Sequence, residues 1–118
     1  MWLCTRYDFF SVVRGDDRIS PGKVMVRARK AGHLRNLQGR FAELRDVPLK
    51  TSSTTDYPCR LVVNREVWAR IGAELAADID YTNFKNAAGG ELADDSDYSE
   101  FLHEVWWKGM QLLQRSEE

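Results

Sequence analysis

The chain has 118 residues, of which 43% are hydrophobic and 11% aromatic, which excludes a wholly disordered protein and is enough for one buried core. Its formal net charge is −1, so the overall electrostatic field neither repels nor recruits nucleic acid. Residues 1–50 hold 11 Lys and Arg against 5 Asp and Glu, whereas residues 51–118 hold 6 against 13. A basic face for an acidic partner would explain this asymmetry, but attraction between the two halves within one fold is the favoured interpretation.

Three strands are predicted near the N-terminus. Aromatic and β-branched side chains dominate residues 1–14, which indicates a strand, a kink near Asp8 and a second strand. Turn residues then precede a third strand at 23–30, where small apolar side chains alternate with a set that includes Arg27 and Arg29. This third strand should therefore show one face to the core and a basic face to solvent.

A helix, a strand and a second helix follow. Leucines and a phenylalanine at three- and four-residue spacings predict an amphipathic helix over 33–45. A polar loop at 51–55 precedes a strand at 57–63, in which Arg60 alternates with apolar residues. Asn64 is a good N-cap for the next helix because its side chain accepts hydrogen bonds from free backbone amides. The apolar stripe of that helix comprises Val67, Trp68, Ile71, Leu75 and Ile79.

The last helix has the clearest pattern. Residues 86–96 are expected to form a loop, because they contain two adjacent glycines and several acids. Asp97 and Glu100 then resemble a capping box at the start of a helix. Its broad apolar face comprises Tyr98, Phe101, Leu102, Val105, Trp106, Gly109, Leu112 and Leu113. Residues 116–118 are expected to fray.

The predicted order is therefore βββαβαα, in a single domain spanning residues 1–118. An antiparallel or mixed sheet with helices packed on one face satisfies these patterns, which places the chain in the α+β class. We find no internal repeat.

The sequence predicts no metal site, no cofactor and no membrane contact. Cys4 and Cys59 lack CxxC spacing and clustered histidines, which argues against zinc. Both lie in predicted strands, so burial as small apolar residues is favoured over a disulfide. The N-terminus does not resemble a secretion signal and no apolar stretch approaches membrane-spanning length, so a cytoplasmic protein is expected.

Several motifs resemble a small uncharacterised bacterial protein family of about this length. The segments that carry the resemblance are Met1-Trp2-Leu3 with Thr5, Phe9 to Val13, Val26 to Arg29, Asp56-Tyr57 with Arg60, Ile79 to Tyr81, Asn83 to Lys85, and His103 with Val105-Trp106. The Asp-Tyr-x-Asn-Phe-Lys piece at residues 80–85 is the most specific. This chain departs from the family pattern at Asp8, where glycine is expected, at Cys59, where an aromatic is common, and at Trp107, where a small residue is usual. The resemblance implies a fold and a set of residues, but no reaction.

The first candidate site is an anion site. It comprises Arg27, Arg29, Arg60, Asp80, Tyr81, Asn83 and Lys85. If the strands that hold Arg27 and Arg60 are neighbours, guanidinium groups converge there, and their planar shape suits phosphate or carboxylate. The favoured alternative is a structural network in which Asp56 and Asp80 pair with these arginines. In that case Asn83 caps a helix or a turn.

The second candidate site is a protein-binding surface on the last helix. Trp107 falls almost opposite the apolar face, beside His103 and Met110, so it needs a second surface to cover it. Aromatic and methionine side chains of this kind are enriched at interfaces, whether with a protein partner or in a homodimer. Cover by an internal element, such as the loop at 51–55, is an equal alternative.

No catalytic constellation is present. Neither His33 nor His103 belongs to a recognisable acid–base pair, and the chain has no nucleophile elbow and no phosphate-binding loop. The expected function is therefore a small non-catalytic binding or adaptor domain that acts through its last helix. One alternative is anion or nucleic-acid binding through Arg27, Arg29 and Arg60, although a pI near 6.1 disfavours nucleic acid. Another is a phage-encoded inhibitor of a host complex.

Overall fold

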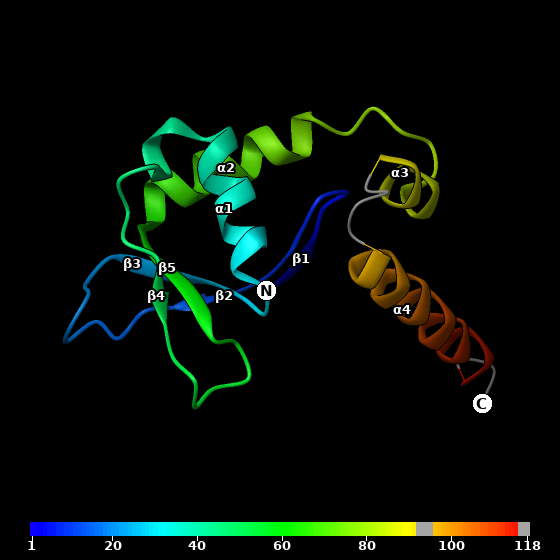
Figure 1. The fold of residues 1–118 in the computed structure, drawn as a ribbon, viewed down its shortest axis with the longest axis horizontal. Helices are drawn as coiled ribbons and strands as arrows, with labels where there is room; N and C mark the ends of the chain where they lie inside the picture. The colour runs from blue at the N-terminus through cyan, green and yellow to red at the C-terminus, as the bar shows by residue number, and fades with distance from the viewer. Residues whose placement is uncertain (92–95, 116–118) are drawn as a thin grey trace. The chain divides into compact units, whose positions relative to one another are not determined.

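The computed structural model describes residues 1–91 and 96–115. The chain divides into two compact units, Met1–Asp80 and Tyr81–Glu118, which are described separately (Figure 1). The single domain expected from the chain length stays a prediction.

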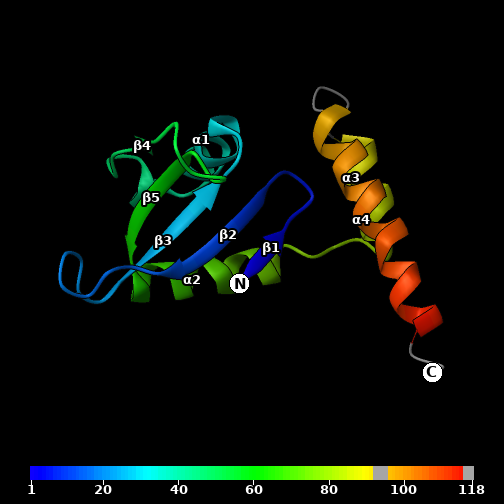
Figure 2. The ribbon, with the colours of Figure 1, turned by 90° about the horizontal axis from the view of Figure 1, so that it is seen from below.

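Residues 1–80, all of them described, build a five-stranded sheet in which every neighbouring pair of strands is antiparallel (Figure 2). The strands, in the spatial order β1-β2-β3-β5-β4, are β1 (Trp2–Cys4), β2 (Phe9–Arg14), β3 (Lys23–Ala28), β5 (Cys59–Asn64) and β4 (Lys50–Thr51). The antiparallel form of the predicted α+β fold is confirmed. The two-residue strand β4 was not predicted, because its second residue belongs to the polar segment at 51–55 that was expected to form a loop.

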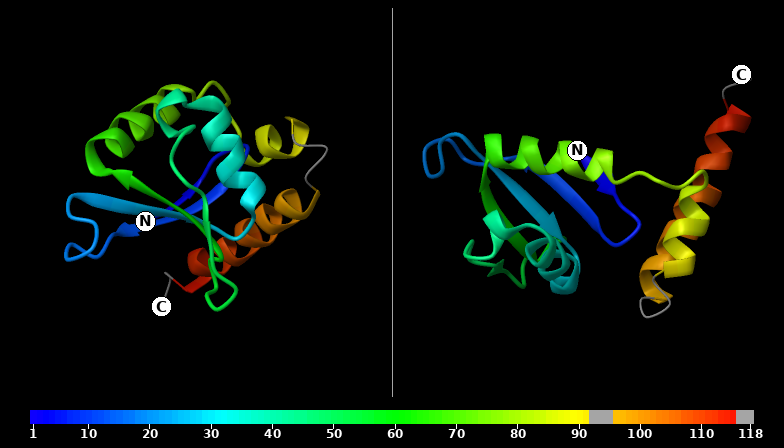
Figure 3. Two further views of the ribbon diagram at one scale, coloured as in Figure 1. Left: turned by 60° about the vertical axis from the view of Figure 1, so that its left-hand side comes forward. Right: turned by 90° about the horizontal axis from the view of Figure 1, so that it is seen from above.

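Two helices cover one face of this sheet, α1 (Ala31–Arg40) and α2 (Arg65–Ala77), as Figure 3 shows. Between α1 and β4 lies a short 3-10 helix, η1 (Ala42–Leu44). The core joins strand residues to helix residues and includes Phe10, Val12, Val24, Val26, Leu61, Val63, Leu34, Leu37, Trp68 and Ile71. The opposite face of the sheet has no helix from residues 1–80 packed on it, so its side chains face outward or contact loops.

The predicted helix boundaries need two corrections. The helix expected at 33–45 is wrong in its extent, because Phe41 adopts an extended conformation (φ −123°, ψ 109°) and ends α1. Asn64 caps α2 as predicted, since the Glu66 backbone N–H donates a hydrogen bond to Asn64 Oδ1 at 2.9 Å. Ile79 does not complete the apolar stripe, because α2 ends at Ala77 and leaves Ile79 58% exposed.

The turn between β1 and β2 encloses a fully buried carboxylate, that of Asp8. The Thr5 hydroxyl donates a hydrogen bond to this carboxylate and accepts one from the Asp8 backbone N–H at 3.1 Å. Arg40, at the end of α1, forms an ion pair with Asp8 at 2.5 Å. No described non-glycine residue has a positive φ, so Asp8 fits this turn without the glycine that the family resemblance predicted. Burial raises the pKa of Asp8 above its ordinary value, and the Arg40 charge opposes that rise.

Two further contacts tie this turn to the helices. Phe9 donates its backbone N–H to Nδ1 of the buried His33 on α1, at 3.2 Å. Arg6 is also buried, and it forms an ion pair with Asp80 at 2.7 Å and donates a hydrogen bond to the Asp78 carbonyl at 3.0 Å. The turn is therefore attached both to α1 and to the segment that follows α2.

The second unit contains α3 (Phe84–Glu91) and α4 (Ser96–Arg115). The loop predicted at 86–96 is wrong over residues 86–91, which belong to α3, and at Ser96, where α4 begins; residues 92–95 lie outside the described residues. The predicted fraying at 116–118 also lies outside them. Among the described residues, no helix is both long and apolar enough to cross a membrane.

We predict that Arg40→Met destabilises the fold in a pH-dependent way. Loss of the guanidinium leaves the buried Asp8 carboxylate without its counter-charge, which should lower the free energy of unfolding by about 3 kcal/mol at neutral pH. The pKa of Asp8 should rise further in the variant, so the loss shrinks as the pH falls and Asp8 takes up a proton. Urea unfolding of both proteins between neutral and acidic pH measures this.

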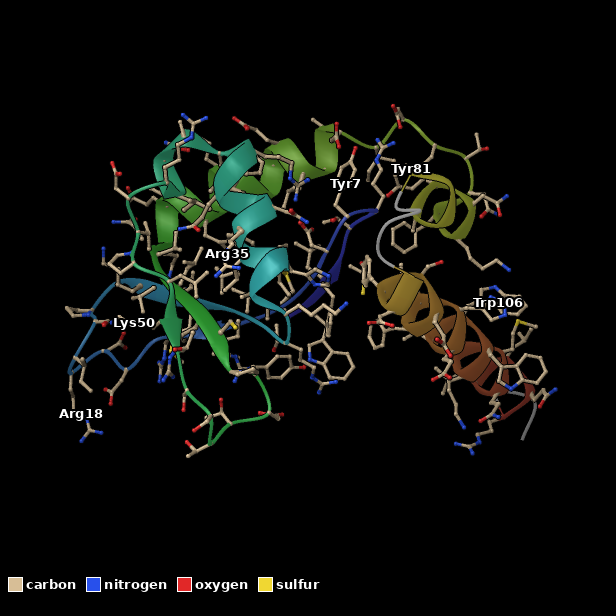
Figure 4. The ribbon with its side chains drawn as sticks, viewed as in Figure 1. Tyr7, Arg18, Arg35, Lys50, Tyr81 and Trp106 are labelled. Atoms are coloured by element: carbon tan, nitrogen blue, oxygen red, sulfur yellow. The ribbon has the colours of Figure 1, made fainter. Side chains whose placement is uncertain are left out.

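Arg35→Met is the matched control, because Arg35 is exposed on the same helix (Figure 4). It should change stability little at any pH. A loss of equal size for Arg40→Met at all pH values would contradict the assigned role of the ion pair.

Candidate functional site

Three cationic residues lie side by side across the sheet, on the face opposite α1 and α2. In the register of β3 against β5, Arg27 is the partner of Arg60, and Lys50 on β4 is the partner of Arg60 on its other side. Side chains alternate along a strand, and since Val26 and Leu61 are buried in the core, Arg27 and Arg60 must point to the other face. We call Arg27, Arg60 and Lys50 the cationic row. The structure thus brings two of the predicted arginines together and adds Lys50, which sequence reasoning missed.

Arg27 and Arg29 are held by an aromatic ring rather than by acids. Their guanidinium carbons lie 4.8 Å and 4.7 Å from the centre of the Tyr57 ring, which is buried. Arg27 also donates a hydrogen bond to the Ser11 hydroxyl at 2.8 Å. Within the part of the chain that the structure describes, none of Arg27, Arg29 and Arg60 forms an ion pair. The predicted network of these arginines with Asp56 and Asp80 is therefore not formed there.

A cavity of about 290 Å³ opens on the same face, next to the cationic row. Its lining comes from the loop between β2 and β3 and from β3, β4 and β5, and comprises Gly15, Asp16, Ile19, Ser20, Met25, Lys50, Arg60 and Val62. Two members of the cationic row, Arg60 and Lys50, thus border a hollow whose other side chains are mainly apolar. Figure 4 labels Lys50 on the sheet.

The segment at residues 80–85 is explained largely by structural contacts. Asp80 pairs with Arg6 at 2.7 Å, so it is not part of the cationic row. Asn83 Oδ1 accepts a hydrogen bond from the Asn86 backbone N–H at 3.0 Å and so caps α3, which confirms the capping role predicted as an alternative. The rings of Tyr81 and Phe84 lie 5.8 Å apart, and Lys85 Nζ lies 4.3 Å from the centre of the Trp106 ring on α4. Tyr81, Asn83 and Lys85 belong to the second unit and are described within it alone.

The C-terminal half of α4 exposes most of its large apolar side chains. The exposed fractions are 47% for Val105, 46% for Trp106, 60% for Trp107, 39% for Met110, 69% for Leu112 and 62% for Leu113. Only the first half of the predicted apolar face is covered, where Tyr98 and Leu102 are 2% and 6% exposed. The predicted partner-binding residues His103, Trp107 and Met110 are all exposed on this helix.

Neither cysteine is poised to act as a nucleophile. Cys4 and Cys59 are free thiols, so the disulfide that was the less favoured alternative is not formed. Cys59 is buried as predicted, whereas Cys4 is only half-buried. Burial raises the pKa of the Cys4 thiol, which disfavours the reactive thiolate.

No protein-family model, no curated protein and no solved structure matches this chain. The resemblance to a small bacterial family therefore stays a prediction, and what the chain does has to be argued from its own surfaces.

We predict that Asn83→Ala destabilises the second unit, because α3 loses the side chain that caps its first turn. The free energy of unfolding of α3 and α4 should fall by about 1 kcal/mol. Asn83→Asp should retain most of this stability, since a carboxylate also accepts the hydrogen bond from the Asn86 backbone N–H. Urea unfolding followed by helical circular dichroism and tryptophan fluorescence measures both variants.

Asn86→Ala is the matched control, because Asn86 contributes only its backbone N–H to the cap. It should be neutral or slightly stabilising, as alanine favours a helix more than asparagine does. If Asn83→Ala proved as stable as the wild type, the cap would not be the role of Asn83.

Proposed function

We propose that this protein is a non-catalytic binding domain that acts through protein–protein contacts of the C-terminal half of α4, and that the partner is a second copy of the chain. The observation that carries the proposal is the exposure of six large apolar side chains between residues 105 and 113. An apolar patch of this kind on a folded protein is typical of an interaction site.

The second unit cannot cover this surface itself. Helix α3 has 8 residues and α4 has 20, which correspond to lengths of about 12 Å and about 30 Å. Tyr98 and Leu102, near the start of α4, are buried, and Lys85 of α3 still reaches the Trp106 ring. Trp107, Leu112 and Leu113 nevertheless remain 60% exposed or more. Full burial of an exposed leucine side chain contributes about 1.5 to 3 kcal/mol, against which the entropic cost of association is set. Several such side chains on one helix supply enough driving force for a specific contact.

The spacing of the exposed residues supports a helix as the partner. Val105, Gly109 and Leu112 follow one another at intervals of four and three residues, which is the seam spacing of paired helices. Gly109 lies in this seam, and nothing lies within 4 Å of where its Cβ would be, so another backbone can approach closely there. Trp107 lies almost opposite this seam, with Met110 beside it, so a second element of the partner copy would have to cover these two side chains.

The charges on α4 support a second copy in antiparallel orientation. The acidic residues Asp97, Glu100 and Glu104 precede the basic residues Lys108 and Arg115 along the helix. Two antiparallel copies would bring the basic end of each helix toward the acidic end of the other, whereas parallel copies would align like charges. Electrostatic complementarity therefore favours the antiparallel pair.

A cytoplasmic location belongs to the same proposal. It is supported by two cysteines that remain free thiols, as expected in a reducing compartment.

We expect light scattering coupled to size-exclusion chromatography to show a dimer of the wild-type chain. Leu113→Ala and Trp107→Ala should each shift it toward monomer, since each removes apolar area from the contact. Gln111→Ala, on the polar side of α4, is the matched control and should leave the dimer intact. High salt should weaken the dimer only modestly, because burial of apolar surface drives it.

Thermal unfolding of the same variants separates an interface from a core. Monomeric variants whose unfolding temperature no longer depends on protein concentration would support the proposal. A wild type that is monomeric in every condition would overturn the proposal. Large losses of stability in Leu113→Ala or Trp107→Ala under conditions where the wild type is monomeric would also overturn it, because they would place these side chains in a core.

A further inference from the structure

We propose that the face of the sheet opposite α1 and α2 binds a small organic anion, a phosphate monoester or carboxylate attached to an apolar body. The anionic group would lie on Arg60 and Lys50, and the apolar body would fill the adjoining cavity. This site is independent of the α4 surface and rests on different residues.

Without a ligand, the cationic row destabilises the fold. Like charges directly opposite each other on neighbouring strands are destabilising, and this row places three of them in register. Among the described residues no acid forms an ion pair with Arg60, Lys50 or Arg27. An anion bound across the row would relieve this repulsion, and guanidinium groups bind phosphate and carboxylate through paired hydrogen bonds.

The position of Arg27 strengthens this arrangement. Tyr57 and the Ser11 hydroxyl hold its guanidinium beside the row, at 4.8 Å from the ring centre and 2.8 Å from the oxygen. Arg27 therefore contributes positive charge from a fixed position, whereas Arg60 and Lys50 have no such partner in residues 1–91 and 96–115 and are available to a ligand.

The cavity would hold the apolar body of the ligand. Met25 and Val62, which are partners in the β3–β5 register, form an apolar floor beside Arg60, and Ile19 from the β2–β3 loop adds an apolar wall. A volume of about 290 Å³ is at the lower end of ligand sites in proteins, so it suits a small ring or short chain. Ser20 adds a hydroxyl to the lining.

The one acid in the lining is already engaged. Asp16 accepts hydrogen bonds from the Arg18 backbone N–H at 3.0 Å and from the Arg18 guanidinium at 3.3 Å. These bonds lower the pKa of Asp16, and they give its charge a partner within the β2–β3 loop.

A small anion fits these observations better than a nucleic acid. The row ends at Lys50 on the edge strand, and the Tyr57 ring is buried under two arginines, so this ring offers no face for a base to stack on.

Isothermal titration with phenyl phosphate and benzoate as probes tests the proposal on the 118-residue chain. Inorganic phosphate and a single-stranded oligonucleotide are the comparison ligands. We expect phenyl phosphate or benzoate to bind in the millimolar range or better, and inorganic phosphate to bind more weakly, because it cannot use the apolar floor. Arg60→Gln and Lys50→Gln should each weaken binding by about tenfold or more. Arg35→Gln, which removes a charge from α1, should leave binding unchanged.

The stability of the unliganded variants distinguishes a binding role from a structural one. Arg60→Gln should unfold at the same temperature as the wild type or higher, since it relieves repulsion within the row. Absence of binding by phenyl phosphate and benzoate would overturn the proposal, as would binding that Arg60→Gln and Lys50→Gln leave unchanged. Tighter binding of the oligonucleotide than of either probe would also overturn it and would point to a polyanion.

Discussion

The register of β3 against β5 is the constraint on which the rest of the first unit depends. Val26 lies opposite Leu61, and Arg27 lies opposite Arg60, so apolar residues meet on one face and cationic residues on the other. A shift by one residue would exchange the two faces and move guanidinium groups into the core. Because α1 and α2 cover only one face, the fold tolerates a single register. The same register creates the cationic row, which is thus a consequence of how the core is built.

Charge pairs across long sequence distances hold the β1–β2 turn in place. Asp8 pairs with Arg40 on α1, and Arg6 pairs with Asp80 beyond the end of α2. Each pair has one buried partner, Asp8 in the first and Arg6 in the second. Such pairs add little net stability relative to apolar residues, but removing the partner of a buried charge is costly. Their effect is to specify where the turn lies. Asp80, the first residue of the most specific family-like segment, is therefore used for structure, and the segment needs no ligand to explain its chemistry.

The sequence predicted those elements whose signal is local. The alternation of apolar and polar residues around Arg27 indicated β3, and Asn64 marked the start of α2. Both signals depend only on residues that are close together in the sequence. Lys50 was missed because a two-residue strand has no period and exists only through its pairing with β5. Helix α3 was missed because Gly89 and Gly90 each disfavour a helix by about 1 kcal/mol, which its cap and its packing against α4 offset. The cluster of Asp8, Arg40 and His33 depends on tertiary contacts that no short pattern encodes.

Ion pairs in the structure account for only part of the charge asymmetry between residues 1–50 and residues 51–118. Some of it joins the two halves of the sequence, since Arg6 pairs with Asp78 and Asp80, and Arg70 pairs with Glu43. This part agrees with the favoured interpretation of mutual attraction. The rest does not, because Arg27 and Lys50 come from the basic half and gain no acidic partner among the described residues. A fold selected for stability alone would separate such charges or pair them. The core fixes which positions share this row but not which residues occupy them, and cations at these positions, beside a cavity with an apolar floor, are what the proposed anion site requires.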